Sequence, residues 1–137
     1  MKKITLITIL TVFMLILTGC HKSDSPTVVL EEMADAFDDL IADMEKSDDV
    51  DSAIVSIEKF SVVMKKLKPR MDKVKEKYPD IDKTFKGKRE FPEEFKDLKK
   101  RFEEIGPKLS AIMGKMIKYM GDPKFQEAQR KFQESIK

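Results

Sequence analysis

The segment AIVSIEKFSVVMKKLKPRMDKVKEKY, residues 53–78, decides the fold of this chain. Its apolar side chains recur at alternating intervals of four and three residues. This spacing places them along one side of an α-helix that packs against other helices. The members of the seam are Ala53, Ile57, Phe60, Met64, Leu67, Met71, Val74 and Tyr78. The segment therefore predicts one helix about 28 residues long.

A second seam with the same spacing predicts another long helix. Its members are Phe95, Leu98, Phe102, Ile105, Leu109, Ile112, Met116 and Tyr119. Shorter apolar faces near residues 26–46 and 123–136 predict two further helices. Four amphipathic helices in a row, joined by short connections, indicate an all-α, up-down-up-down four-helix bundle.

Capping residues support these limits. Ser25-Pro26 and Asp122-Pro123 each place a capping oxygen before a proline at the first helical position. Ser47 is expected to begin the second helix, because two aspartates follow it. Gly121 is expected to end the third helix in the left-handed conformation.

Pro69 and Pro107 lie inside the two long helices, on the side opposite the core. An interior proline kinks a helix, and a break at Gly106-Pro107 would split the third helix and give five helices. The sequences around the two prolines also match at an offset of 38 residues. A duplicated helix and convergence under the same packing both explain that match.

The amino-terminal segment has the order of an export signal. Lys2 and Lys3 precede an apolar run, Ile4 to Leu17, and small residues then lead to Cys20. The run of about 14 residues is shorter than the roughly 20 that span a bilayer. Cys20 is the only cysteine, so the chain forms no internal disulfide.

The sequence Leu17-Thr18-Gly19-Cys20 resembles the lipobox of bacterial lipoproteins. The resemblance implies cleavage before Cys20, a thioether from Cys20 to diacylglycerol, and an acylated new amino terminus that holds the protein in a membrane. His21 stands where an aspartate would favour inner-membrane retention, so the outer membrane is expected. The alternative is a cleaved secretory signal with a chance cysteine.

These features divide the chain into three parts. Residues 1–19 form the signal peptide, residues 20–25 the lipidated cysteine and a short linker, and residues 26–137 the bundle. The residues from His21 to Ser25 span roughly 17 Å when fully extended. We therefore expect the bundle to lie close to the membrane.

Charge argues against a nucleic-acid partner. The chain carries 27 basic and 25 acidic side chains, and loss of Lys2 and Lys3 leaves a formally neutral mature protein. The charges are segregated, however, because residues 31–51 hold ten acids and one base. These acids are expected to attract neighbouring helices, or alternatively to offer an acidic face to a basic partner.

The connection of residues 79–91 is long for a helical bundle. Its apolar side chains are expected to cover the end of the bundle while its cations stay solvated. The alternative is a basic, aromatic loop that contacts an anionic surface such as lipid headgroups or a cell-wall polymer. The cations of that alternative are Lys83, Lys86, Lys88 and Arg89.

Methionines raise the question of metal binding. Met113, Met116 and Met120 lie along one side of the predicted third helix, and thioethers bind Cu(I). Packing in the core is the favoured interpretation of these side chains. With one histidine and one cysteine in the chain, a structural zinc site is not expected. No nucleophile motif or phosphate-binding loop is present, so the sequence predicts no enzyme.

The order of helices resembles that of the small periplasmic four-helix-bundle cytochromes b. The matching phrases are Leu30-Glu31-Glu32-Met33, Pro92 to Ile105, and Phe125-Gln126-Glu127-Ala128-Gln129. In that family haem is held by an early methionine, for which Met33 is the counterpart, and by a histidine near the end of the last helix. This chain has no histidine at the second position.

The sequence thus favours a membrane-anchored, non-enzymatic helical binding or structural module whose partner is an envelope protein or polymer. The alternative is a haem or copper carrier with a methionine-lined core, in which Met33, Met113, Met116 and Met120 are the candidate ligands. A self-associating structural lipoprotein is a third class.

Overall fold

The computed structural model describes residues 25–87 and 89–137, which form helices and no strand. The elements are α2 (Pro26–Lys46), α3 (Val50–Lys77), α4 (Ile81–Phe85), the 3₁₀ helix η1 (Glu93–Phe95), α5 (Lys96–Ile117) and α6 (Pro123–Ser135). The predicted all-α bundle is confirmed. The lipobox and Cys20 lie outside the described residues.

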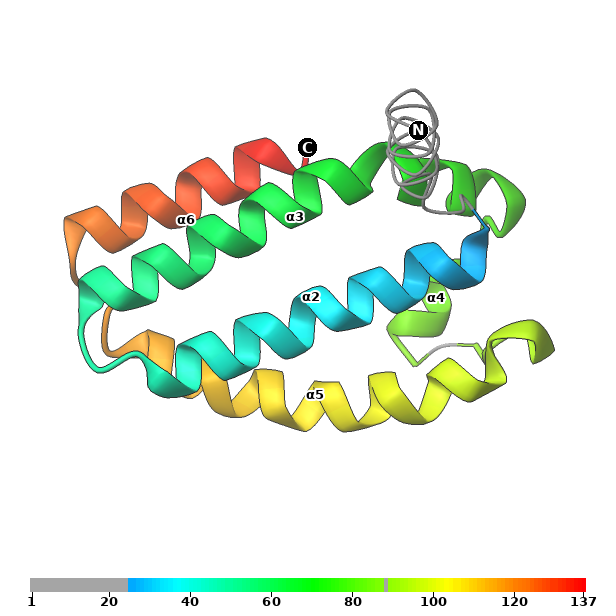
Figure 1. Cartoon of the computed structure of the whole chain (residues 1–137), viewed down its shortest axis with the longest axis horizontal. Coiled ribbons are helices and arrows are strands. Elements are labelled where there is room, and N and C mark those ends of the chain that lie inside the picture. The colour runs from blue at the N-terminus through cyan, green and yellow to red at the C-terminus, as the bar shows by residue number, and fades with distance from the viewer. Residues whose placement is uncertain (1–24, 88) are drawn as a thin grey trace, which may run out of the picture.

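The two amino-terminal helices form the centre of the bundle. α2 and α3 run antiparallel and pack against each other, α5 packs against α2, and α6 packs against α3 (Figure 1). α5 and α6 meet at their connecting turn, where the ring centroids of Tyr119 and Phe125 are 5.8 Å apart. Away from that turn the two outer helices flank opposite sides of the central pair.

Capping side chains fix the helix starts. The Ser25 hydroxyl accepts the Val28 N–H at 3.3 Å, and the Asp122 carboxylate accepts the Lys124 N–H at 2.8 Å, as predicted. The expectation that Ser47 begins α3 is wrong. Ser47 instead ends α2, because its buried hydroxyl donates to the carbonyl of Asp43 at 2.9 Å.

Asp49 begins α3 through a reciprocal cap. Its carboxylate accepts the Ser52 N–H at 2.8 Å, and the Ser52 hydroxyl accepts the Asp49 N–H at 3.3 Å. The Ser52 hydroxyl also donates to the Asp49 carboxylate at 2.7 Å, and this hydrogen bond, together with that from the Ser52 N–H, lowers the pKa of Asp49.

The prolines do not divide the long helices. Pro69 and Pro107 lie within continuous α3 and α5, and both are exposed, so the carbonyls that lose a hydrogen bond lie on the solvent side. The alternative of a break at Gly106-Pro107 is therefore not found, and the additional helix is α4 in the connection. The left-handed conformation expected at Gly121 is also wrong, since Gly87 is the one described residue with a positive φ.

The core contains two clusters, and the members of both predicted seams are buried or half-buried, all except Phe60 in a cluster or packed against one. The open-end cluster lies near the start of α2 and is formed by Val29, Leu30, Met33, Leu67, Met71, Val74, Ile81, Phe95 and Leu98. The turn-end cluster lies near the two turns and is formed by Ala34, Ile41, Met44, Ala53, Ile57, Ile105, Ile112, Tyr119 and Phe125. Phe37 and Phe102 pack against both clusters. All of these side chains lie beyond residue 28, so a chain that begins at residue 21 contains every one of them.

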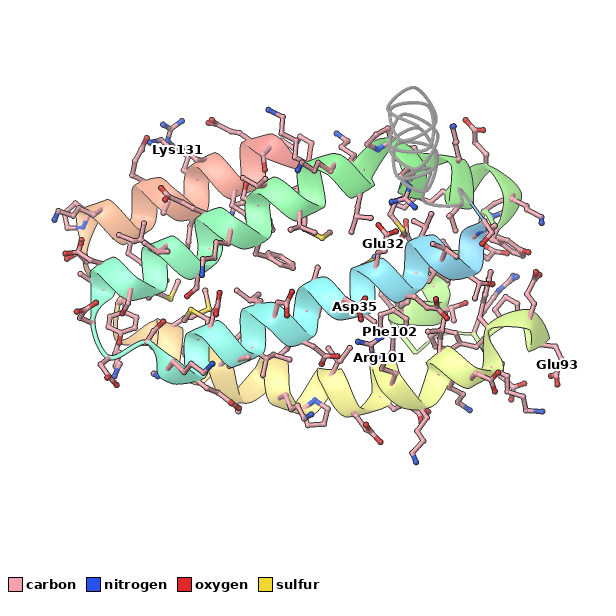
Figure 2. All side chains as sticks on the ribbon, viewed as in Figure 1. Glu32, Asp35, Glu93, Arg101, Phe102 and Lys131 are labelled. Atoms are coloured by element: carbon pink, nitrogen blue, oxygen red, sulfur yellow. The ribbon has the colours of Figure 1, made fainter. Side chains whose placement is uncertain are left out.

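Ion pairs join the acidic α2 to both of its neighbours. Arg70 of α3 contacts Glu32 at 2.5 Å, and Lys59 contacts Asp43 at 3.1 Å. Arg101 of α5 lies against Asp35 (Figure 2) at 2.5 Å.

Arg101 also contacts Asp38 at 2.7 Å, and its hydrogen bonds to Asp38 and Asp35 raise the pKa of its guanidinium. The prediction that the acidic stretch attracts neighbouring helices is confirmed for these pairs.

Candidate functional site

α6 covers only one half of α3. The hydroxyls of Ser61 and Ser135 lie 3.0 Å apart, which places the end of α6 beside the middle of α3. Residues 62–77 of α3 extend past the end of α6, so α6 does not lie beside them (Figure 1). We call residues 62–77 the uncovered half of α3.

A cavity of about 220 Å³ lies beside the uncovered half of α3. Its apolar lining comes from α2, α3, α4 and the residue after α6, and consists of Met33, Met64, Met71, Phe85 and Ile136. Four charged side chains also line it, namely Lys68, Asp72, Lys75 and Asp82. The ammonium of Lys75 is 3.3 Å from the carboxylate of Asp82. We call this cavity the methionine cleft.

The helical seam explains why methionines gather there. Met64 and Met71 are two turns apart on the core-facing side of α3, and Met33 faces them from α2. Met33 is 7% exposed and Met71 is 9% exposed, so their thioethers lie inside the fold. Flexible thioethers suit an irregular apolar space and also adapt to varied apolar ligands.

The methionines singled out near the end of the predicted third helix lie elsewhere, with Met113 in α5 and Met120 in the turn after it. Met113 is 64% exposed and Met120 is 47% exposed, whereas Met116 is half-buried against the turn-end cluster. Core packing is therefore wrong for Met113 and Met120. The physical reason is that α5 packs mainly against α2, and on its other side Met113 and Ile117 are exposed in the part of the chain that the structure describes.

The connection between α3 and α5 packs against the open-end cluster, at the end of the bundle where α2 begins. Ile81 is 1% exposed, and the rings of Phe85, Phe91 and Phe102 form a triangle with centroids 5.0–6.0 Å apart. The prediction that apolar residues of this connection cover the end of the bundle is confirmed. A second cavity of about 470 Å³ lies against this triangle, between Arg89 and Lys99.

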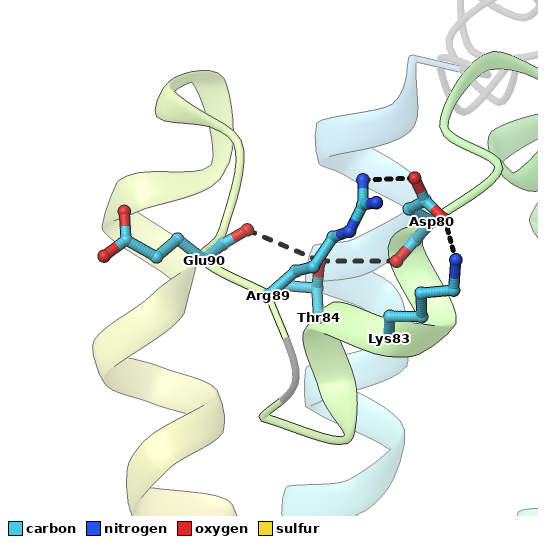
Figure 3. Close-up of polar contacts among 5 residues, drawn as sticks. All are labelled: Asp80, Lys83, Thr84, Arg89 and Glu90. Carbon is cyan, nitrogen blue, oxygen red and sulfur yellow. Dashed lines mark hydrogen bonds and ion pairs between the residues drawn. The ribbon is translucent and has the colours of Figure 1, made fainter.

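The cations predicted in this connection are partly paired. Lys83 contacts the Asp80 carboxylate at 2.6 Å, and Arg89 binds its other oxygen (Figure 3). The hydrogen bond from Lys83, followed by the charge of Arg89, lowers the pKa of Asp80. Lys86 is exposed and forms no ion pair with a described residue, and Lys88 lies outside the described residues.

The uncovered half of α3 carries more net positive charge than the connection between α3 and α5. It holds two acids, Asp72 and Glu76, and seven bases, Lys65, Lys66, Lys68, Arg70, Lys73, Lys75 and Lys77, so seven minus two gives +5. Arg70 is held by Glu32 and Lys75 by Asp82. Within the described parts of the chain Lys65, Lys66 and Lys68 form no ion pair.

Metal and haem binding require ligating side chains that meet in space. No group of three or more His, Cys, Asp or Glu side chains among the described residues is arranged to hold a metal ion. Met33 lies in the core, but the only histidine of the chain, His21, is outside the described residues. None of the described helices is both long and apolar enough to cross a membrane.

Comparisons with protein-family models, with curated proteins and with solved structures found no match.

Proposed function

We propose that the chain is a lipid-anchored, non-enzymatic helical module of the bacterial cell envelope that binds another envelope component through the methionine cleft. The observation that carries the binding role is that α6 ends beside the middle of α3, and that an apolar cavity of about 220 Å³ lies past its end among the described residues. Apolar cavities with a few charged groups at the edge are typical binding sites. The anchor is supported by the resemblance of residues 17–20 to a lipobox.

Mass spectrometry of the protein purified from bacterial envelopes tests the anchor. We expect the first peptide to begin at Cys20 and to carry diacylglycerol and an added acyl chain. An unmodified amino terminus, or one that begins at another residue, contradicts lipid anchoring.

Photo-crosslinking in intact cells tests the binding role. A photoreactive amino acid at Ile136, which lines the cleft and is 40% exposed, is expected to form adducts with envelope components. The matched control is the same amino acid at Met113, which is 64% exposed on α5. Equal adduct formation at both positions contradicts a binding role for the cleft.

A copper carrier is a second candidate, favoured by the three thioethers of Met33, Met64 and Met71 around one cavity. Thioethers select Cu(I) over harder ions. Titration of residues 21–137 with Cu(I) against a chromophoric chelator tests this candidate. This candidate is supported if the protein binds one equivalent of Cu(I) and loses that binding when Met33, Met64 and Met71 are all replaced by leucine. Leucine conserves the volume of methionine but has no sulfur. The control replaces Met113, Met116 and Met120.

A further inference from the structure

We infer that the uncovered half of α3 is a membrane-contact surface, where anionic phospholipid headgroups meet its unpaired lysines and an acyl chain enters the methionine cleft. This inference deepens the proposed function by naming the envelope component, and it rests on that proposal for the position of the membrane. The ligand is a lipid of the bilayer itself, with a negatively charged headgroup.

The position of the linker brings this surface to the bilayer. The start of α2 at Pro26 lies at the same end of the bundle as the end of α3 and α4 (Figure 1). The residues from His21 to Ser25 reach roughly 17 Å when fully extended. Met33 is seven residues along α2 from Pro26, a rise of about 11 Å. A lipid on Cys20 therefore keeps the cleft within reach of neighbouring lipids.

The charge of the surface suits anionic headgroups. Lys65, Lys66 and Lys68 are free of ion pairs in the described structure, and basic residues near a membrane attract anionic lipids. The cleft itself is balanced, because Lys68 and Lys75 there face Asp72 and Asp82. The excess positive charge consequently comes from lysines of α3 outside the cleft lining, such as the exposed Lys65 and Lys66, which fits a headgroup held outside the apolar lining.

The size and lining of the cleft suit part of an acyl chain. A dry apolar cavity of about 150 Å³ accommodates benzene, so the 220 Å³ here accommodates several methylene groups. Methionine side chains adjust to the shape of such a chain. Phe85 and Ile136 complete an apolar wall on two further sides.

A tryptophan placed in the cleft tests acyl-chain entry, since the natural chain has no tryptophan. Residues 21–137 with Met64→Trp are mixed with vesicles that contain phosphatidylglycerol with brominated acyl chains. We expect bromine to quench the fluorescence and the emission to shift to shorter wavelength. Ile136→Trp provides a second probe at an exposed position, and Met113→Trp on α5 is the control, expected to stay unquenched.

Charge reversal tests the headgroup contact. Lys65→Glu with Lys68→Glu is expected to weaken co-sedimentation with phosphatidylglycerol vesicles about tenfold or more. Lys100→Glu with Lys108→Glu changes charge equally on α5, where both lysines are exposed, and is expected to have a smaller effect. Vesicles of phosphatidylcholine alone are expected to bind neither protein measurably.

Two results overturn the inference. The first is an absence of quenching at both cleft positions with protein bound to the vesicles, which assigns the cleft to another occupant. The second is a stable dimer in gel filtration that shields the cleft tryptophan from a soluble quencher, which assigns it to a second copy. The protein used in these vesicle experiments begins at residue 21 and so lacks Cys20. Either result therefore leaves lipid anchoring to be decided separately by mass spectrometry.

Discussion

The two core clusters have the same kinds of side chain but different cover. The turn-end cluster is enclosed by α2, α3, α5 and α6, and its Phe125 is completely buried. The open-end cluster is covered by α4 and by aromatic residues of the connection, and the methionine cleft lies beside it. Val29, Leu30 and Phe95 of the open-end cluster are also almost completely buried, so both ends belong to the folding core, and the methionine cleft lies beside the core at the open end.

The largest effect is expected from breaking the enclosed end. Phe125→Ala removes a completely buried ring, and such truncations cost about 3–5 kcal/mol of unfolding free energy. Phe85→Ala at the open end removes a half-buried ring and is expected to cost clearly less. Urea unfolding followed by helical circular dichroism measures both. Equal losses at the two positions would contradict the difference in burial of the two rings.

An ion pair at the open end is expected to give the next largest effect. Arg70 binds Glu32 with two nitrogens, at 2.5 and 3.3 Å, and the two side chains are only 18% and 19% exposed. Arg70→Met leaves the Glu32 carboxylate partly buried without this partner, at a cost of about 1–3 kcal/mol. The same unfolding measurement applies.

Arg130→Met is the control for the Arg70 change. Arg130 pairs with Glu127 and Glu134 within α6, where its side chain is 57% exposed, so little change is expected. A loss as large as that of Arg70→Met would mean that burial does not set the strength of these pairs.

A smaller, pH-dependent effect is expected at the turn end. The folded pKa of Asp49 is lowered by Ser52, so the ionised carboxylate stabilises the fold above the unfolded pKa of 3.8, and this contribution is lost as the pH falls through the folded value. Asp49→Asn keeps a capping oxygen without the charge. We expect the variant to be less stable near neutral pH and equal to the natural protein in acid, measured by unfolding midpoints across pH. A constant difference at all pH values would exclude this origin.

The smallest effect is expected on the exposed side of α5. Met113→Gln with Ile117→Gln replaces apolar side chains that are 64% and 65% exposed, so unfolding free energy should change by no more than about 0.5 kcal/mol each. Thermal unfolding compared with the natural chain measures it. A loss above 2 kcal/mol, which is several times this range, would show that α5 has a neighbour on this side.

Sequence periodicity predicted the bundle because the seams of α3 and α5 record which side chains meet other helices. Local chemistry also predicted the caps at Ser25 and Asp122. Ser47 was assigned to the wrong helix, since serine caps a start and also bonds back to a carbonyl at an end, and the spacing alone does not separate the two.

The candidate site was less predictable than the fold. Met64 and Met71 belong to a regular seam. Such a seam predicts which side of a helix faces the core, but it does not show how far a neighbouring helix extends along that side. The one available signal was length, because the last predicted helix is about half as long as the second. Met113 and Met120 lie next to seam positions, so their exposure depends on the neighbours of α5 rather than on their own spacing.

Phe37 and Phe102 pack against both core clusters, so the two ends of the bundle share side chains. Melting is therefore expected to be a single cooperative transition of the whole domain. A ligand that occupies the cleft stabilises only the native state, by an amount that grows with the logarithm of its concentration over its Kd. Such a ligand should raise the melting temperature of the distant helix α6 as much as that of α3, which makes a simple thermal-shift assay a screen for what this protein binds.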